Sequence, residues 1–197
     1  MDMSLKGLVQ AAVDTIRDPR GGARKIMALS IPRRQRWEIL ALIVVLSAVL
    51  AQLSFLLAGS TGASLAGPFP SSSFTLGLVQ AVLLLTMVYA IHFIGRRVGG
   101  SGALDDSILL VAWLQFIMIC LQVLQTAMLF VVPAISMMIG VVGLVLFFWL
   151  LTNFISELHG FKSLTAIFVG ITLSMLAFAI ALSILLGMFG IFLPGVQ

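Results

Sequence analysis

The chain has 197 residues, of which 61% are hydrophobic and only 9% are charged. An ordinary soluble domain carries roughly 25% charged residues, and a fold this apolar could not cover its surface with polar groups in water. The formal net charge is +4, with eight of the eleven Lys and Arg residues in positions 1–38. This basic segment leads directly into a hydrophobic stretch, so anionic lipid, not nucleic acid, is its expected partner.

Residues 1–38 are expected to form a basic cytoplasmic or interfacial arm with two short amphipathic helices. Apolar residues recur at helical spacing from Leu5 to Ile16. Asp18 and Pro19 then resemble a helix start, with Asp as the cap and Pro in the first turn. The second helix would lie in the headgroup plane or, alternatively, pack on the cytoplasmic loops. The side chains predicted to contact lipid headgroups are Arg20, Arg24, Lys25, Arg33, Arg34 and Arg36.

Five uncharged stretches follow, each with about the 20 apolar residues that a membrane-spanning helix needs. They predict an all-α, polytopic membrane protein with a bundle of five transmembrane helices over residues 39–190, followed by a short tail over 191–197. The predicted spans cover about residues 39–58, 74–94, 108–131, 135–156 and 164–189.

The third and fourth spans form one uncharged run from Ser107 to Ser156. As a single helix this run would be roughly 75 Å long, far more than a bilayer is thick. Pro133 is the expected break, because proline removes a helix hydrogen bond and clashes with the preceding turn. A tight hairpin over 132–134 is predicted, and a re-entrant pair is the alternative.

The charged residues beyond the arm lie in two connections, 95–107 and 157–163, on the same side as the N-terminus. The connection over 59–73, the hairpin and the tail carry no charge. Because cytoplasmic loops are enriched in Lys and Arg, the pattern predicts a cytoplasmic N-terminus and an extracytoplasmic C-terminus.

The third span carries a polar stripe, since Gln115, Gln122 and Gln125 share one helix face. Buried amides are costly unless they are hydrogen-bonded, so the stripe should face other helices. Its expected partners in the bundle interior are Gln52, Gln80 and Asn153. One interpretation is interhelical bonding, worth about 0.6–2 kcal/mol for each bond. The other is a polar path or ligand site.

The connection between the fourth and fifth spans contains Glu157, His159, Gly160 and Lys162. Gly160 is expected to cap the fourth helix, while the charged residues position the loop. A metal site needs more ligands than this connection offers, so no cofactor, metal or catalytic residue is expected. The segment RRVGGSGALDD lacks the Lys-Ser/Thr ending of a phosphate-binding loop and is interpreted as a flexible cytoplasmic turn.

Three segments together resemble a known family: DPRGGARKIMAL, PRRQRWEILAL and ISELHGFKSLTAIFVGI. With five spans and this orientation, the chain resembles the Ypt-interacting-protein (YIP) domain family in its bacterial branch. Eukaryotic members are associated with Rab-type GTPases and vesicle trafficking. Their acidic-aromatic cytoplasmic motif is missing from this sequence, so that role is not transferred.

The missing catalytic constellation and the compact five-span layout predict a non-enzymatic protein with a membrane-organising or accessory role, and the composition suggests a bacterial inner membrane. Its expected partners are a bilayer with anionic headgroups and either another membrane protein or a second copy. The alternative is a small carrier or lipid-moving protein that uses the polar stripe. An intramembrane enzyme is a more distant third interpretation.

Overall fold

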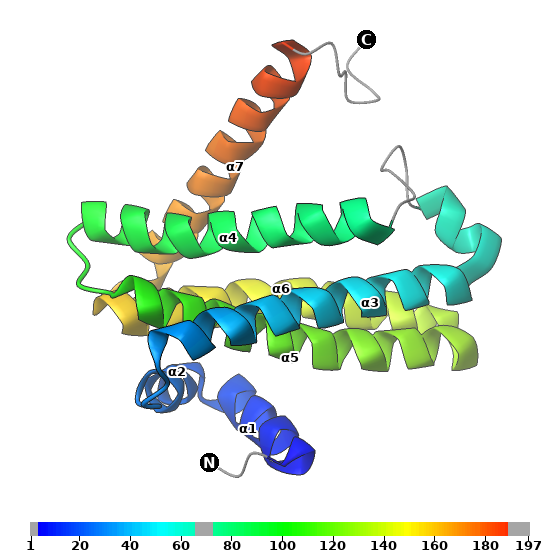
Figure 1. Ribbon diagram of the computed structural model, residues 1–197, viewed down its shortest axis with the longest axis horizontal. Helices are drawn as coiled ribbons and strands as arrows, with labels where there is room; N and C mark the ends of the chain where they lie inside the picture. Colours follow the sequence, from blue (N-terminus) through cyan, green and yellow to red (C-terminus); the bar gives the residue numbers. More distant parts are fainter. Residues whose placement is uncertain (1–3, 66–72, 189–197) are drawn as a thin grey trace.

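The computed structural model describes residues 4–65 and 73–188, which form helices and no strand (Figure 1). Five of these helices are long and apolar enough to cross a membrane, so the predicted all-α, polytopic fold is confirmed. The helices are α1 (Leu5–Arg17), α2 (Pro19–Met27), α3 (Arg33–Leu65), α4 (Ser73–Arg97), α5 (Leu104–Val131), α6 (Pro133–His159) and α7 (Leu164–Met188).

The two short helices of the arm begin at side-chain caps. The Ser4 hydroxyl accepts a hydrogen bond from the Gly7 N–H at 3.1 Å, and the Asp18 carboxylate accepts one from the Gly21 N–H at 2.9 Å. Such caps satisfy N–H groups that have no partner inside the helix. Pro19 occupies the first turn of α2, which confirms the predicted start of the second helix.

Helices α5 and α6 form the predicted hairpin at Pro133. Helix α5 ends at Val131, Val132 is extended, and Pro133 is the first residue of α6. With 28 and 27 residues, each helix is roughly 40 Å long, which is enough to cross the whole bilayer. Each helix of the hairpin is therefore long enough for a complete span, which favours the hairpin over the re-entrant pair.

Helix α5 lies at the centre and packs against α2, α3, α4 and α6. In Figure 1, α3 to α6 run side by side with nearly parallel axes. Helices α3 and α5 run in the same direction, because Arg36 contacts Asp106 near their starts and Ser54 contacts Thr126 further along both helices.

The end of the first predicted span differs from the sequence prediction. Helix α3 continues to Leu65, whereas the span was predicted to end at about residue 58. The extension carries no charge and contains no proline, since the next proline is Pro68, so nothing local interrupts the helix. Residues 66–72 of the predicted 59–73 connection, the last residue of the fifth span and the 191–197 tail lie outside the described residues.

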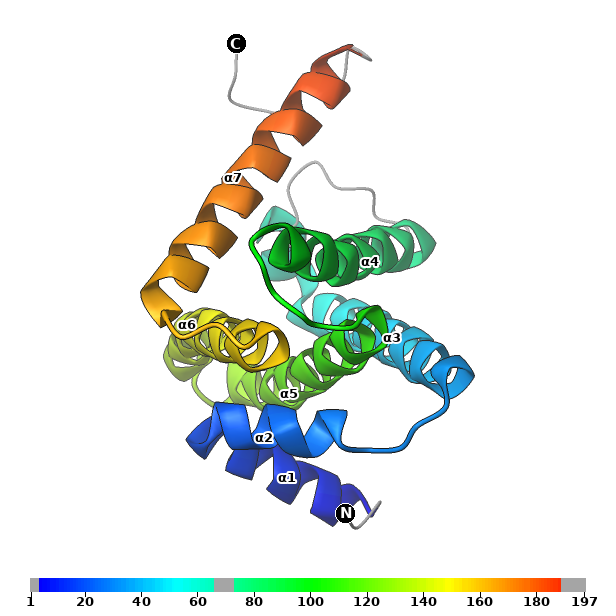
Figure 2. The ribbon, with the colours of Figure 1, turned by 90° about the vertical axis from the view of Figure 1, so that its left-hand side faces the viewer.

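Helix α7 leaves the bundle. It packs chiefly against α6, and Figures 1 and 2 show it diverging from the other helices along its length. Within its apolar span only 11% of the residues are buried, against 17% for α3 and α6, 22% for α4 and 56% for α5. Most of the apolar surface of α7 therefore faces away from its own chain.

Candidate functional site

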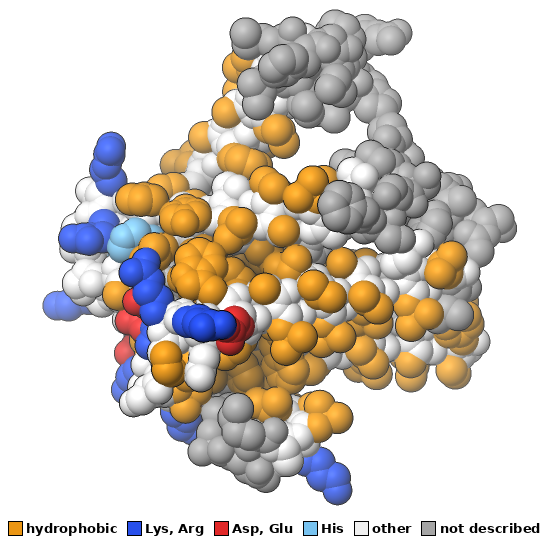
Figure 3. Space-filling view, in the orientation of Figure 1, with side chains coloured by type: hydrophobic (Ala, Val, Ile, Leu, Met, Phe, Trp, Pro, Cys, Tyr) orange, Lys and Arg blue, Asp and Glu red, His pale blue; other side chains and the backbone are white. Residues whose placement is uncertain are grey.

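Charged side chains gather at one end of the bundle and on the arm, while the flank of the bundle beyond that end is apolar (Figure 3). We call this end the charged end; it comprises α2, the first turns of α3 and α5, the last turns of α4 and α6, and the connections that follow those two helices. It contains the densest set of polar contacts in the described part of the chain, so it is the candidate functional site.

His159, the last residue of α6, lies at the centre of the charged end with only 4% of its surface exposed. Its Nδ1 accepts a hydrogen bond from the Gly102 N–H at 3.1 Å, and its Nε2 lies 3.1 Å from the Ile91 carbonyl oxygen. The carbonyl can only accept, so Nε2 carries the proton and the neutral ring satisfies both contacts. The ring also stacks on Phe161 at 5.5 Å between centroids.

Three glycines form a cradle around this imidazole. A Cβ at Gly95 or Gly100 would overlap the ring, and one at Gly102 would come within 2.8 Å of its Cε1 atom. Gly99, between them, has a φ of +95°, in the left-handed region that glycine adopts without strain. The glycine-rich turn, predicted to be a flexible loop, is therefore a close-packed wall of the His159 site.

The connection after α6 is held by its own residues and by the arm. Gly160 adopts a φ of +73° directly after α6, which is the expected geometry of a glycine helix cap. The Ser156 hydroxyl donates to the Phe161 carbonyl oxygen at 2.7 Å and accepts from Arg20 at 3.0 Å. Lys162, the last member of the predicted loop motif, is exposed.

Helix α2 is joined to the end of α6 by two arginines four residues apart. Besides the bond from Arg20, Arg24 Nε forms an ion pair with Glu157 Oε1 at 3.1 Å. Residues at this spacing share one face of a helix, so both arginines reach the last turn of α6. Arg24 is 66% exposed, so most of the binding between arm and bundle must come from apolar packing.

The apolar face of α2 is covered by the bundle. Ala23 and Ile26 are 0% and 4% exposed and join a core cluster with residues of α5 and α6. On α1, Thr15 accepts a hydrogen bond at 3.2 Å from the indole N–H of Trp113, within α5. The arm therefore packs on helices α5 and α6, not on the connections, and the apolar side of α2 does not face lipid.

The start of α3 is joined to the start of α5 by a second pair of arginines. Arg36 donates to Asp106 at 2.7 Å and to the Ile31 carbonyl oxygen at 3.0 Å, with 13% of its side chain exposed. Arg33 lies 3.2 Å from Asp105. Arg34 instead pairs with Glu38 on its own helix at 2.9 Å.

Most of the arginines predicted to contact headgroups thus contact protein groups, while headgroup binding itself stays a prediction. Of the predicted set, Lys25 is exposed and has no ion pair. Within residues 4–65 and 73–188, the Lys and Arg side chains without an ion pair to a carboxylate are Lys6, Arg17, Arg20, Lys25, Arg96, Arg97 and Lys162.

Among the residues that the structure describes, no hydrogen bond joins the glutamines of the predicted polar stripe to one another or to their expected partners. Gln115, Gln122 and Gln125 are half-buried on α5, and the Gln125 amide lies against the backbone of Gly140 on α6. The polar contact across helices nearby is Ser54 to Thr126, at 2.8 Å.

The expected partners of the stripe behave differently from one another. Asn153 is buried but donates to the Trp149 carbonyl oxygen of its own helix at 2.8 Å. The Gln52 side-chain oxygen is buried without a hydrogen-bond partner among the described residues, and Gln80 is half-buried on α4.

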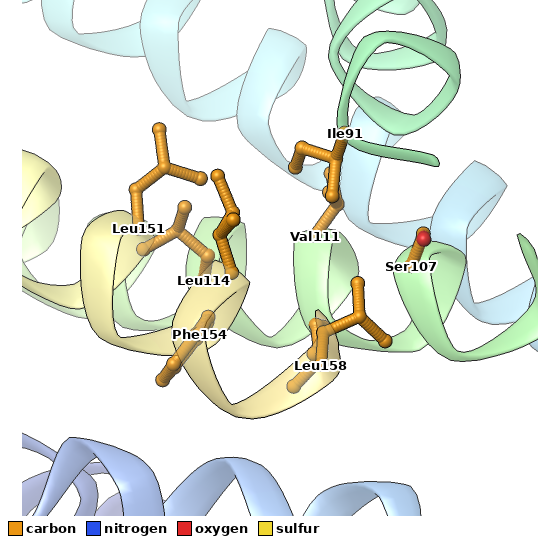
Figure 4. A pocket seen from close by; sticks show the side chains of 9 residues that line it. Ile91, Ser107, Val111, Leu114, Leu151, Phe154 and Leu158 are labelled. Atoms are coloured by element: carbon orange, nitrogen blue, oxygen red, sulfur yellow. The ribbon is translucent and has the colours of Figure 1, made fainter. Parts of the chain in front are cut away.

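A small cavity lies beside this site, between α4, α5 and α6 (Figure 4). Its volume is about 10 Å³ and its lining is apolar except for Ser107, whose hydroxyl donates to the Ala103 carbonyl oxygen at 3.1 Å. A volume of this size holds about one water molecule, so the cavity does not accommodate a solute.

Sequence reasoning missed the His159 cradle and the arginine pairs between helices. His92, near the end of α4, is 9% exposed, and its Nδ1 has no hydrogen-bond partner within the described residues. The sequence did contain a signal for the cradle: Gly95, Gly100 and Gly102 lie close together, and both histidines lie near charged connections.

Comparison with known proteins gives a family for this architecture. The Yip1 domain profile matches residues 13–185, a range that includes the end of α1, all of α2 to α6 and most of α7. Neither the curated proteins nor the solved structures contain a significant match. Because the profile covers nearly the whole helical bundle and the residues of the His159 cradle, the chain belongs to the Yip1 domain family.

Proposed function

We propose that this protein is a non-enzymatic membrane-organising or accessory protein that binds another membrane protein, or a second copy of itself, through its helices. In this proposal it resides in a bacterial inner membrane, with the charged end facing the cytosol. The observation that carries the proposal is the divergence of α7, which leaves long apolar flanks free inside the bilayer (Figure 2).

The free flank of α7 is long enough to contact a partner helix over several turns. Its exposed large side chains recur along the helix at Phe168, Val169, Leu173, Met175, Leu176, Phe178, Ile180, Leu182 and Ile184. Lipid solvates such a surface as well as protein does, so association in a membrane depends on shape and close packing. Helix α7 packs chiefly against α6, so a partner helix could pack closely along the rest of its circumference.

Helix α4 offers a second apolar surface. An open hollow of about 460 Å³ lies along one of its faces, lined by Val82, Leu85, Thr86, Tyr89, Ala90 and Phe93. The rings of Tyr89 and Phe93, which line one end of the hollow, stack with 6.1 Å between centroids. A partner helix could place its side chains there.

The charged end supports the proposed orientation and a structural role. Its exposed cations without ion pairs, Arg96, Arg97 and Lys162 among them, fit the enrichment of Lys and Arg in cytoplasmic loops. His159 is fully engaged by backbone groups. It therefore holds the end of α6 against α4, which is a structural role and agrees with a non-enzymatic protein.

Site-specific photocrosslinking in cells tests the proposal. A photoreactive amino acid at Leu173 or Leu176, both exposed on α7, should give one discrete adduct, which mass spectrometry assigns to a protein partner or to a second copy. The matched control is Leu150 on α6, which is 0% exposed and should give no intermolecular adduct. Labelling by lipid alone at both α7 positions, with a monomer in mild detergent, would refute the proposal.

The second candidate function is a small carrier or lipid-moving protein. It is favoured by the partnerless Gln52 oxygen inside the bundle and by the stripe of Gln115, Gln122 and Gln125. A dithionite assay on fluorescent phospholipid in proteoliposomes tests it. Replacing the three glutamines by Leu should abolish lipid movement while the protein still folds; equal rates in the two proteins, or no movement with either, would exclude this function.

A further inference from the structure

We propose that α1 inserts one side into the hydrocarbon edge of the bilayer, so that lipid acyl chains cover its outer apolar stripe. We call the residues Leu5, Val9, Val13 and Ile16 the outer stripe. This inference concerns the arm and not the α7 flank, and it does not depend on the proposed partner-binding function.

Helix α1 has three distinct sides. Leu8, Ala11 and Ala12 pack into the core cluster of the bundle, and Thr15 is buried beside them. A polar side follows around the helix, formed by Lys6, Gln10, Asp14 and Arg17, on which Gln10 donates to Asp14 at 3.0 Å. The outer stripe occupies the remaining side.

The outer stripe is apolar and exposed although the chain has already buried one side of α1. Leu5 is 73% exposed and Val9 42%. Successive members are four, four and three residues apart, so they lie on one side of the helix. If both free sides of α1 faced water, polar residues would be expected on both. Separate apolar and polar free sides are typical of a helix that lies at the boundary between lipid and water.

The depth of α1 places this stripe beside lipid. Trp113, which donates to Thr15, is roughly 13 Å along the axis from the first residue of α5. A 28-residue helix is roughly 42 Å long, and the hydrocarbon layer takes roughly the middle 30 Å of that length. For α5 along the membrane normal, the contact between Thr15 and Trp113 lies roughly 7 Å inside the hydrocarbon layer.

The charges of α1 agree with this position. Lys6 and Arg17 lie on the polar side and make no ion pair within the described residues. Arg17 lies two residues after Thr15, and its long side chain can extend from the hydrocarbon edge to the headgroups. Anionic headgroups supply the counter-charge that the protein does not. A second copy would have to match an apolar strip and bring carboxylates to both cations.

A nitroxide scan of α1 tests the proposal in the full-length protein. Single cysteines are introduced at each position from 5 to 17 in a Cys120→Ala background and spin-labelled. The protein is then reconstituted into phosphatidylethanolamine and phosphatidylglycerol vesicles. Collision rates with oxygen, which concentrates in hydrocarbon, and with a neutral nickel chelate, which concentrates in water, report what surrounds each label.

The expected result is an oxygen-to-nickel ratio that is several-fold higher at Leu5, Val9, Val13 and Ile16 than at Gln10 and Arg17. Labels at Ala11 and Ala12 should be poorly accessible to both reagents. Four positions report the same stripe, so one misfolded variant does not remove the test.

Two results would overturn the proposal. Nickel access at the outer stripe equal to that at Gln10 would place the stripe in water. Low access to both reagents, with dipolar broadening between labels, would place a second copy on it, and low access without broadening would place another protein there.

Discussion

The charged end and α7 are built from opposite kinds of contact. At the charged end, α2, α4, α5 and α6 meet through backbone bonds to His159, arginine pairs and a buried apolar cluster. Helix α7 has the same apolar character but packs chiefly against one helix. Hydropathy therefore identifies which segments enter the bilayer, and specific close contacts decide which of them form the bundle.

Glycines are also packed differently at the charged end and in α7. At the charged end, glycines lie where another side chain fills the space that a Cβ would need. In α7, Gly170 has no heavy atom within 4 Å of the position of a Cβ. Glycine is thus required by packing in one region and tolerated in the other.

The largest expected effect comes from Gly95→Ala. The new Cβ would overlap the His159 ring, which is buried and held by two backbone groups. We expect a loss of about 3 kcal/mol in unfolding free energy, at the upper end of the usual cost of overpacking. The measurement is unfolding by denaturing detergent in mixed micelles, followed by circular dichroism.

Gly170→Ala is the matched control, because both glycines are inside helices and gain the same helix propensity from alanine. We expect this variant to be as stable as the parent, or more stable by up to about 1 kcal/mol. Equal stability of the two variants would show that the His159 cradle is looser than the structure indicates.

Smaller effects are expected from removing two neighbouring ion pairs that each join an arginine of α3 to a carboxylate. Arg36 and Asp106 join two helices and are 13% and 31% exposed, whereas Arg34 and Glu38 lie on one helix and are 91% and 58% exposed. Double-mutant cycles to Ala should give a coupling of about 1.5 kcal/mol for the first pair, as for a sheltered bond between charged groups. The second should give about 0.3–0.5 kcal/mol, as for exposed pairs within a helix.

High salt sharpens this test, since it weakens the exposed pair first. Equal couplings in low salt would mean that Arg36 contributes no more than a surface charge. The start of α3 would then be held to α5 by apolar contacts alone.

The parts of the fold that the sequence predicted depend on local signals. Charge-free length located five spans, Pro133 marked the hairpin, and Asp18 with Pro19 marked the start of α2. Gly160 was predicted to cap α6, and its left-handed conformation confirms this. Each of these features is decided within a few residues of the chain.

The parts that the sequence could not predict depend on residues distant in the chain. His159 bonds Gly102 and Ile91, which are 57 and 68 positions away, and Arg36 bonds Asp106 at a separation of 70. Nothing in one sequence selects these partners from the other glycines and carboxylates. The divergence of α7 is equally invisible, because its mean hydropathy over the span is 2.4, close to the 2.3 of α5.

The smallest expected effect concerns the half of the bundle away from the charged end, where Ser54 and Thr126 join α3 to α5 at 2.8 Å. The Ser54 hydroxyl already donates to the Leu50 carbonyl oxygen at 2.8 Å, so Thr126 is the donor between the helices. A cycle with Ser54→Ala and Thr126→Val should give about 0.6 kcal/mol, the average for such bonds between membrane helices. Ser174→Ala is the control, since Ser174 bonds the Gly170 carbonyl oxygen of its own helix at 2.7 Å; it should change stability by less than that coupling. A coupling above about 1.5 kcal/mol, near the largest such values measured between membrane helices, would show that polar bonds hold this half of the bundle as firmly as the charged end.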